Sequence, residues 1–369
     1  MPVNDDQPLL IDTQSGLNTL CDKLASATQL YCDTEFVRTQ TYWPTLCLVQ
    51  IAGNGTSGCV DVLADIDTDD FRALVNNRPE PLILHAAKQD LEAWFATWGN
   101  LPGSVFDIQV GAGLLGFQPQ IGYANLVNEI TGVMLNKDQT RTDWSRRPLT
   151  QAQIQYATDD VTYLPALYEE ITERLKEKDR LDWAIADSAA LVDQNLYDTK
   201  PEEAWQRLTG IPYLPLPIQA RARALACWRE SRSKSANRPR QWILSDKALM
   251  ELAHINPQHE KELDQIGDMP PSVKRKQGKH LLEIIEQSNA DLTAGNLELQ
   301  QKPVPAPPDK AQVRQLSAIV KATGEELGIA PELLATRKDI ARILHGKVDG
   351  RPLQGWRKAI IGDKLVAAC

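Results

Sequence analysis

Strand-forming sequence is confined to the first part of the chain, and this feature restricts the fold more than any other. Alternating or β-branched runs occur at 29–36, 45–52, 58–63 and 82–87, separated by turns and helix-like stretches. Two of the predicted helices cover 106–116 and 150–180. From about Tyr197 onward, only amphipathic helical patterns remain, interrupted by proline-containing turns. The pattern predicts one α/β domain with a mixed sheet, followed by helical domains.

The composition changes where we place the domain boundaries. We expect an α/β domain over 1–196, a first helical domain over 197–295, a linker over 296–308 and a second helical domain over 309–369. The linker contains KPVPAPP, which cannot form regular hydrogen-bonded structure. The helical domains share three positions at an offset of 91 residues, which suggests a duplicated unit. These pairs are Lys247 and Lys338, Leu249 and Ile340, and Leu252 and Ile343.

Charge is distributed unevenly along the chain. Residues 1–196 hold 13 Lys+Arg and 28 Asp+Glu, a balance of −15, whereas residues 197–369 hold 27 and 21, a balance of +6. An acidic first part is typical of a domain that holds cations, and a basic second part is typical of one that meets polyanions. Acidic surface that only aids solubility explains the first part equally well, so charge alone leaves both explanations open.

The cysteines and the first residues of the chain indicate the cellular compartment of the protein. Six cysteines are scattered without a C-x-x-C pair, which predicts a reducing compartment and no structural zinc. The start MPVNDDQPLL lacks a signal peptide's basic and apolar regions, and no stretch approaches about 18 uninterrupted apolar residues. No G-x-x-x-x-G-K-[ST] loop occurs. We therefore expect a cytoplasmic protein that is not in a membrane and uses no nucleotide cofactor. The sequence does not determine the oligomeric state, and a monomer is the default expectation.

Four acidic residues stand where burial would be costly. Asp33 and Glu35 lie on one face of the strand LYCDTEFV, and two like charges there require either solvent or a cation. Asp90 comes just after a buried strand, at a helix start. Asp160 lies four residues after Tyr156 on one helical face. No His or Cys cluster accompanies these acids, so the donor set is all oxygen and favours Mg²⁺ or Mn²⁺.

Two such ions, about 3.5–4 Å apart, catalyse in-line displacement at phosphorus. Tyr156 shares its helix face with the last acid and can orient the attacking water, whereas Asp159 is expected to point elsewhere and meet solvent. Taken alone, Asp90 is explained as an acid that stabilises a helix start, and Tyr156 as an aromatic at the core edge. The four acids together favour the metal site.

Three motifs resemble those of a known nuclease family. The segments DTEF, HAAKQDLEAW and YATDD, in this order, resemble the three exonuclease motifs of the DEDD nucleases, in the version with tyrosine in the third motif. The segments YWPTLCLVQIA, FDIQVGAGLLG and TRTDWSRRPLT resemble ribonuclease D. The segment LACWRESRSKSANRPRQWILSDKALMELA resembles the helicase-and-RNase-D C-terminal (HRDC) domain, and GIAPELLATRKDIARIL with GWRKAIIG resembles it more weakly.

The resemblance implies both a fold and an activity. The fold is a ribonuclease H-like, DnaQ-like exonuclease domain with a mixed sheet, followed by two all-α HRDC-type domains. The activity is that of a 3′→5′ exoribonuclease that uses two divalent cations, Mg²⁺ or Mn²⁺, and releases nucleoside 5′-monophosphates. Its implied partners are RNA 3′ ends, especially those of tRNA precursors and other structured RNAs.

The same resemblance implies a role for each motif residue. Asp33, Glu35 and Asp160 hold the ion that activates water. Asp33 bridges to the second ion, which Asp90 supports. Tyr156 positions the nucleophile, and Glu35 also touches the terminal 3′-hydroxyl.

Other residues near the motifs have plainer or open interpretations. Arg146 and Arg147 precede the catalytic helix, and they either reach substrate phosphates or brace their loop. Gln50 and Gln89 are near the motifs, but nothing in the sequence argues that they meet the 3′-terminal nucleotide. His85 is expected to be a satisfied, partly buried histidine.

The helical part is the expected source of RNA affinity. The arginine-rich stretch 221–242 and the cluster 274–280 are expected to contact phosphates, and a solvated face is the alternative explanation of such charge runs. Trp228 is expected in the core, and an exposed tryptophan can stack a base. One alternative is a DNA exonuclease of the same superfamily, which a preference for terminal ribose would exclude. The other is a non-catalytic RNA-binding scaffold, which the presence of all four acids disfavours.

Overall fold

The computed structural model describes residues 9–136, 138–139 and 142–369. These residues form two compact units. Of the described residues, the first unit contains 9–37, 45–194 and 306–369. The second unit contains residues 38–44 and 195–305.

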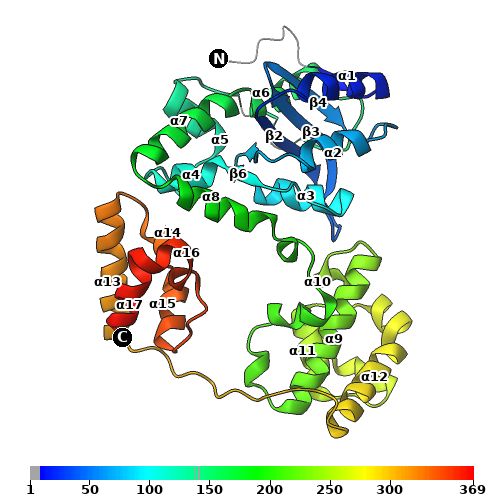
Figure 1. The fold of residues 1–369 in the computed structure, drawn as a ribbon. Helices are drawn as coiled ribbons and strands as arrows, with labels where there is room; N and C mark the ends of the chain where they lie inside the picture. The colour runs from blue at the N-terminus through cyan, green and yellow to red at the C-terminus, as the bar shows by residue number, and fades with distance from the viewer. Residues whose placement is uncertain (1–8, 137, 140–141) are drawn as a thin grey trace. The chain divides into compact units, whose positions relative to one another are not determined.

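Three antiparallel strands form the centre of a six-stranded mixed sheet in the first unit (Figure 1). They are β2 (Leu30–Val37), β3 (Thr45–Gly53) and β4 (Thr56–Asp61), as their sequences predict. Burial alternates along most of β2 because successive side chains point to opposite faces. The predicted α/β domain with a mixed sheet is therefore confirmed.

Shorter strands extend the sheet in parallel at both edges, in the order β1-β4-β3-β2-β5-β6. Strand β1 (Leu10–Ile11) pairs with β4, β5 (Leu82–Leu84) pairs with β2, and β6 (Val105–Asp107) pairs with β5. The sequence pattern assigns residues 106–116 to a helix, which is wrong at its start. Helix α4 (Ile108–Leu114) begins only after the buried strand β6, because its N-cap is the last residue of that strand.

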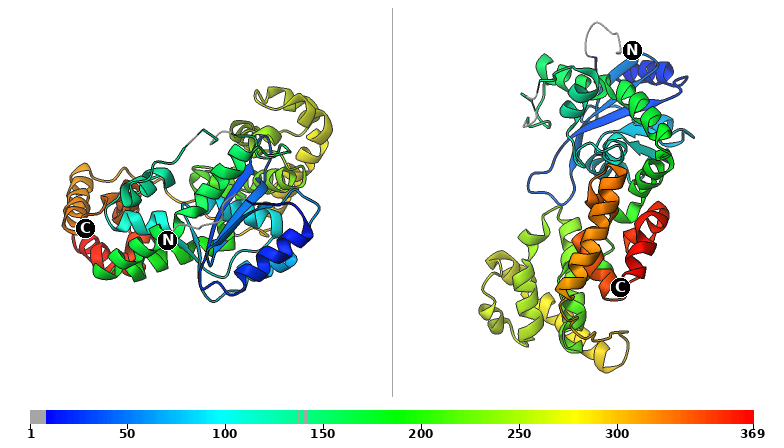
Figure 2. Two further views of the ribbon diagram at one scale, coloured as in Figure 1. Left: turned by 90° about the horizontal axis from the view of Figure 1, so that it is seen from above. Right: turned by 90° about the vertical axis from the view of Figure 1, so that its left-hand side faces the viewer.

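Helices cover both faces of this sheet (Figure 2). Helices α1 (Gln14–Leu24) and α3 (Lys88–Trp98) pack on one face, and α6 (Gln151–Thr162) packs on the other. Two hydrogen bonds show that these helices lie on opposite faces. Thr34 of β2 bonds to Asp90 of α3, whereas Cys59 of β4 bonds to Thr158 of α6. The remaining helices of this part are α2 (Asp69–Asn76), α5 (Tyr123–Thr131), α7 (Leu164–Glu177) and α8 (Leu181–Ala189).

The sequence pattern predicts one helix from Thr150 to Arg180, and this prediction is wrong. The helix is divided at Tyr163 into α6 and α7. Pro165 explains the division, because proline has no N–H with which to continue the hydrogen bonding of the preceding helix. The break lets α6 pack on the central strands while α7 packs on α4 and α5.

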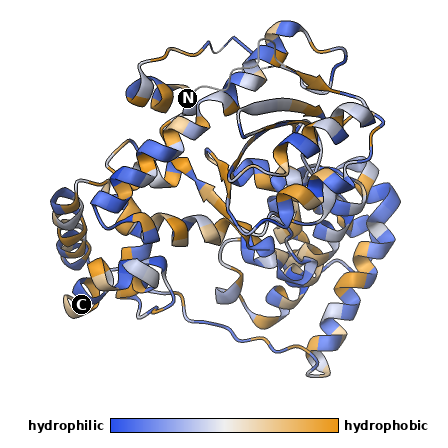
Figure 3. Ribbon diagram, turned by 45° about the horizontal axis from the view of Figure 1, so that its top comes forward, coloured by the Kyte–Doolittle hydropathy of each residue, from blue (hydrophilic) through white to orange (hydrophobic). Residues whose placement is uncertain are grey.

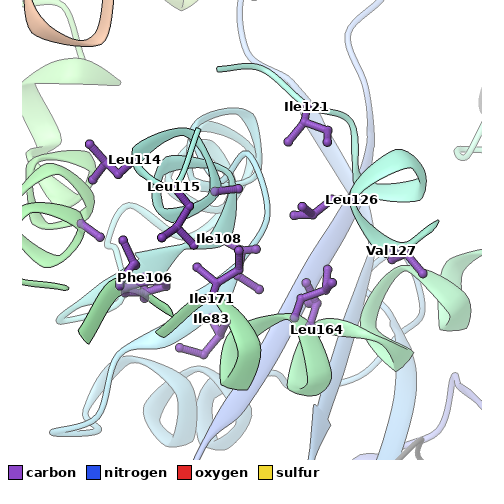
Figure 4. Packing of buried hydrophobic residues seen from close by; sticks show 14 of the residues in the cluster. Ile83, Phe106, Ile108, Leu114, Leu115, Ile121, Leu126, Val127, Leu164 and Ile171 are labelled. Atoms are coloured by element: carbon purple, nitrogen blue, oxygen red, sulfur yellow. The ribbon is translucent and has the colours of Figure 1, made fainter. Parts of the chain in front are cut away.

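A buried apolar cluster holds these helices against the parallel edge of the sheet (Figure 4). Ile83 and Phe106 come from strands β5 and β6, whereas Leu126, Leu164 and Ile171 come from α5 and α7. Full burial of each such side chain contributes about 1.5–3 kcal/mol. Along the helices, hydrophobic residues alternate with hydrophilic ones, as amphipathic packing requires (Figure 3).

The C-terminal helices have a core of their own and also pack on α8 of the same unit. Arg357 forms a bidentate pair with Asp187 at 2.7 and 2.6 Å, and Trp356 stacks on Trp183 with ring centroids 4.2 Å apart. These helices are α13 (Lys310–Leu327), α14 (Pro331–Leu334), α15 (Arg337–Leu344), α16 (Gly355–Arg357) and α17 (Asp363–Ala367).

The regular elements of the second unit are all helices, as the sequence predicts. The main ones are α9 (Leu216–Ser235), α10 (Arg240–Ile243), α11 (Asp246–Ile255) and α12 (Pro271–Thr293). Pro215, Pro239 and Pro270 directly precede α9, α10 and α12, so the predicted proline breaks are confirmed. In both units, none of the described helices is long and apolar enough to cross a membrane.

Gly111 lies where α4 meets α7, and it tests the packing of the first unit. A methyl group at this position would lie 2.8 Å from Ile171 Cγ2 and 3.2 Å from Leu175 Cδ1. We expect Gly111→Ala to lower the free energy of unfolding by about 1–3 kcal/mol, because buried side chains must shift. Urea denaturation measures this change. The control is Gly267→Ala, where a methyl group would meet nothing within 4 Å, and equal losses from both substitutions would contradict the packing.

Candidate active site

Strand β2 places two acids on one face of the sheet. Asp33 lies opposite Gln50 of β3, and Glu35 lies opposite Leu48, so both acidic side chains face the same way. The register shifts between Glu35 and Phe36. An irregularity of this kind re-aims side chains and is common next to active sites.

The first turn of α3 lies beside the part of β2 that extends beyond its pairing with β5. Pairing between β2 and β5 joins Leu30 to Leu82 and Tyr31 to Ile83, and β5 ends one residue later. The chain then turns into α3, which carries Asp90 in its first turn. The end of a parallel strand is where ligands bind in open α/β sheets.

Asp90 is more than an acid that stabilises a helix start. It is only 8% exposed, and its Oδ1 accepts a hydrogen bond from Thr34 Oγ1 at 2.6 Å. Stabilising the helix dipole requires neither burial nor a partner on another element. The bond from Thr34 therefore fixes Asp90 against the strand that carries Asp33 and Glu35.

Asp107 holds the turn before α3, a role that the sequence did not reveal. Its carboxylate accepts hydrogen bonds from the N–H groups of Ala86 at 2.9 Å and Ala87 at 3.0 Å. Ala86 has a φ of 58°, a left-handed conformation that is uncommon for residues other than Gly. Strained backbone of this kind is concentrated at functional sites.

Helix α6 supplies the third part of the site. Thr150 and Gln153 form a capping box at its start, which satisfies two otherwise unpaired N–H groups. Tyr156 and Asp160, one turn apart, line the same hollow of about 180 Å³. The prediction that these two side chains share a face is confirmed.

Two further residues line this hollow, and the sequence assigned neither of them to the site. Asp159 was expected to point elsewhere and meet solvent. It is half-buried, lines the hollow beside Asp160, and accepts a hydrogen bond from Gln155 at 2.8 Å. Tyr123 donates its hydroxyl proton to the carbonyl of Asp159 at 2.9 Å. Burial raises the pKa of Tyr123, and the charges of Asp160 and Asp33 raise it further. No local sequence signal pointed to this tyrosine.

The four acids lie close enough to raise one another's pKa. Burial raises the pKa of Asp33 well above its usual range, and the charges of the other three acids raise it further. Burial and neighbouring acids raise the pKa of Glu35 to about 9 and that of Asp160 to about 8. Burial raises the pKa of Asp90 to about 7, against the opposing hydrogen bond from Thr34. The predicted residues are therefore brought together from β2, α3 and α6.

The donor set of this site suits a hard divalent cation. All four side chains are carboxylates, which are preferred ligands of Mg²⁺ and Mn²⁺, and a cation offsets the cost of bringing them together away from bulk water. None of the ion pairs among the described residues includes one of these acids. In their present orientations, no three described His, Cys, Asp or Glu side chains already form a group that would hold an ion.

Gln50 is the most unusual neutral residue near the acids. It is fully buried in β3, and neither polar atom of its amide finds a hydrogen-bond partner among the described residues. A buried group left in this state costs about 1–3 kcal/mol. A polar residue inside the apolar run LCLVQIA was the available sequence signal. Gln89, by contrast, is exposed on α3.

The structure decides between the two explanations for the arginines before α6. Arg147 donates to both carboxylate oxygens of Asp61 at 2.6 Å and to the carbonyl of Cys47 at 3.0 Å. It therefore braces its loop against β3 and β4. Arg146 has an 83% exposed side chain and pairs with Asp143 at 3.1 Å, so it is the arginine that remains accessible to solvent.

His85 is buried, as predicted. It is 8% exposed, and burial lowers its pKa to about 4, so the ring is neutral near pH 7. Its ring packs edge-on against Tyr123 with centroids 5.7 Å apart. The ring is only partly satisfied, because its Nε2 finds no hydrogen-bond partner among the described residues.

The arginine-rich stretch of the second unit is only partly available to RNA. Arg221 and Arg229 are buried and donate to main-chain carbonyls at 2.6 and 2.9 Å. The expectation that the whole stretch contacts phosphates is wrong for these two residues, because their charges stabilise the fold instead. Trp242 is 50% exposed and Trp228 packs against the apolar core, as predicted for the latter.

Two family models match the chain. A model described as 3'-5' exonuclease matches residues 8–176, and a model of the HRDC domain matches residues 218–285. The first match contains all four acids and Tyr156.

Relatives match nearly the whole chain. Ribonuclease D of Gluconacetobacter diazotrophicus is 39% identical over 368 residues, which cover 98% of this chain and 92% of the relative. Ribonuclease D of Acidiphilium cryptum is 36% identical over 362 residues, which cover 97% and 92%. The solved structure of Escherichia coli RNase D, described as an exoribonuclease involved in structured RNA processing, is 28% identical. It matches with a TM-score of 0.85 and covers 97% of both chains.

The two arginines before α6 provide a matched pair for testing whether Arg147 stabilises the fold through its contacts with Asp61 and Cys47. We expect Arg147→Ala to lower the free energy of unfolding by about 3 kcal/mol or more, because Asp61, 6% exposed, loses its partner. The change in Arg146→Ala should stay within about 0.5 kcal/mol, because that side chain is exposed. Urea denaturation measures both, and similar values for the two variants would rule out a bracing role.

Proposed function

The chain belongs to the ribonuclease D family, and from this premise we propose how it acts as a 3′→5′ exoribonuclease. Two divalent cations, Mg²⁺ or Mn²⁺, assist hydrolysis of the terminal phosphodiester bond, and the products are nucleoside 5′-monophosphates. One observation carries the proposal. Four acids from three separate elements gather where burial and mutual repulsion raise their pKa, an arrangement that bound cations stabilise.

The four acids share the holding of the ions in this proposal. Asp33, Glu35 and Asp160 would hold one ion, and Asp33 with Asp90 would hold the other. When bound, such ions activate water and stabilise the leaving oxygen. The protein supplies the positions of the carboxylates, through the register of β2, the bond from Thr34 to Asp90 and the capped start of α6.

Tyr156 and Glu35 act on the end of the RNA. Because Tyr156 lines the same hollow as Asp160, we assign its hydroxyl to orienting the attacking water. Glu35 would also accept a hydrogen bond from the terminal 3′-hydroxyl. This second contact explains a preference for chain ends over internal bonds.

The proposed substrates are RNA 3′ ends, especially those of tRNA precursors and other structured RNAs. The names of the relatives support RNA as the substrate, and the description of the E. coli protein supports structured RNA. The choice of tRNA precursors is our prediction. A monomer without a nucleotide cofactor remains our prediction.

We also propose that residues 309–369 form a second HRDC-like domain. Helices α10 and α14 begin and end 91 residues apart. Helices α11 and α15 also begin 91 residues apart, after the capping residues Ser245 and Thr336. This repeat supports boundaries at 1–196, 197–295 and 309–369 with a linker over 296–308.

The proposed chemistry is tested with a labelled tRNA that carries a few extra 3′ nucleotides. In Mg²⁺, we expect stepwise release of 5′-monophosphates, resolved by gel electrophoresis and thin-layer chromatography. EDTA should abolish the reaction, and Asp33→Asn should slow it by at least about 10³-fold, because a shared carboxylate ligand is lost.

The matched control is Asp182→Asn, which removes an exposed carboxylate on α8 and should leave the rate unchanged. RNA that binds but is never shortened would contradict the proposal and favour a non-catalytic scaffold. Equal shortening of a DNA strand of the same sequence would overturn only the choice of substrate, because an RNA enzyme recognises the 2′-hydroxyl.

A further inference from the structure

A groove crosses the C-terminal helical domain between α13 and α15. Two hollows of about 670 and 390 Å³ join there, and both are lined by Val313, Arg314 and Arg337. The larger hollow is also lined by Val320 and Ile340, which are buried. The groove therefore combines an apolar floor with cationic walls.

The cations of this groove follow a regular pattern. Lys310, Arg314 and Lys321 lie on one face of α13, because positions 310, 314, 317 and 321 recur at helical spacing. They extend over about 16 Å of helix, at 1.5 Å per residue. Arg337 faces them from α15, and Glu332 is the acid that lines the same groove.

These cations are available to a ligand. Lys310, Arg314 and Arg337 are exposed, and among the described residues no ion pair involves them. Lys321 pairs with Glu325 of its own helix at 3.7 Å, with both side chains about 70% exposed. Exposed pairs of this kind contribute little stability, so an anion can replace Glu325 at small cost.

The helical fold does not require cations at these positions. In the first helical repeat, the positions 91 residues earlier hold Gln219, Arg223, Glu230 and Asp246. Their combined charge is −1, whereas the four groove residues carry +4. Gln219 and Glu230 are buried there, so the helix pair forms without cations at these positions, and helix packing does not account for the stripe.

We propose that this groove binds the phosphate backbone of RNA; the proposal builds on the exoribonuclease function given above. Arginine forks bind phosphate oxygens in pairs, and cations spread along a helix fit an extended polyanion better than a single phosphate. The hydroxyls of Ser317 and Thr336, which also line the groove, add polar contacts. The apolar floor accepts ribose and base surfaces.

The test compares two double variants of the full chain with the same loss of charge. Arg314→Gln with Arg337→Gln removes two groove cations, and Lys347→Gln with Lys364→Gln removes two exposed cations elsewhere in the same domain. Binding of a fluorescein-labelled single-stranded 20-mer RNA is measured by anisotropy in EDTA, over a range of salt concentrations. We expect the groove variant to raise Kd about tenfold or more and to reduce the slope of log K against log salt by about 1.4.

An equal rise in Kd for the two double variants would overturn the proposal, because the loss of affinity would then depend on total charge and not on the groove. An unchanged RNA Kd, together with binding of polyglutamate that the groove variant loses, would assign the groove to an acidic protein instead. Wild-type protein that binds RNA in EDTA but does not shorten it in Mg²⁺ would contradict the proposed function and leave the groove intact.

A second inference concerns Gln50, whose buried amide has no partner among the described residues. Its place in the sheet is defined by register, since it lies opposite Asp33 on one side and Cys59 on the other. Residues directly opposite each other have Cβ atoms about 4.5–5.5 Å apart. Cys59 contacts Thr158 of α6 at 3.4 Å, so α6 covers the row that contains Gln50.

We infer that Gln50 is a positioning residue for Asp33. Its amide would hold the Asp33 carboxylate in the orientation that an ion requires, because ligating carboxylates are themselves held by hydrogen bonds. The buried Gln50 amide would lower the stability of the fold while the ion is absent. It would gain a hydrogen-bond partner when an ion orients the Asp33 carboxylate. This inference rests on the metal site proposed above.

Gln50→Leu keeps the volume and removes the polar atoms, so it separates this role from ordinary packing. In EDTA, we expect its Tm to equal or exceed that of the wild type. The gain in Tm on adding Mg²⁺ should shrink, and the Kd for Mg²⁺, measured by calorimetry, should rise about 10–100-fold. The control is Gln219→Leu, which removes hydrogen bonds to the carbonyls of Pro212 and Leu214 and should lower Tm equally with and without Mg²⁺.

If Gln50→Leu lowers Tm equally in both conditions, or leaves the Mg²⁺ affinity unchanged, the positioning role is wrong. A wild-type protein whose Tm does not respond to Mg²⁺ would instead overturn the metal site itself.

Discussion

Mutual repulsion among four carboxylates is the constraint on which the first unit depends. Burial and neighbouring charge both disfavour their ionised forms, so apolar packing alone would not hold them together. Specific polar contacts do this instead. Thr34 bonds to Asp90, and Asp107 holds the turn before α3. These contacts fix Asp90 against β2, whereas the amide of Gln50, opposite Asp33, has no partner among the described residues, so the polar part of the site is only partly connected.

The sequence predicted those parts of the site whose signal is local. Alternation in β2 placed Asp33 and Glu35 on one face, and helical spacing placed Tyr156 and Asp160 together, as the structure has them. Prediction from the sequence failed where contact with a distant part of the chain determines the secondary structure. Residues 105–107 form a strand because β5 lies beside them, and periodicity over three residues cannot indicate this.

The arginines show the same limit. Arg147 and Arg146 are adjacent and identical in chemistry, yet one is a brace and the other is exposed, because only Arg147 reaches Asp61. Arg221 and Arg229 likewise belong to a basic stretch but are buried. Composition counts charges without showing whether they face carbonyl groups inside the fold or solvent. Only tertiary contacts separate the two.

The two proposed helical repeats share the features that form and pack their helices. Both keep a capping residue before the helix at the 91-residue offset, Ser245 in one and Thr336 in the other. Both keep buried aliphatic side chains one turn later, with Leu249 at 0% and Ile340 at 2% exposure. Caps and core suffice to form the repeat, because together they satisfy the first N–H groups and bury the apolar face. The remaining positions differ between the two, and in the C-terminal one Lys310, Arg314 and Arg337 line a groove. Its charge is therefore better explained by binding than by folding.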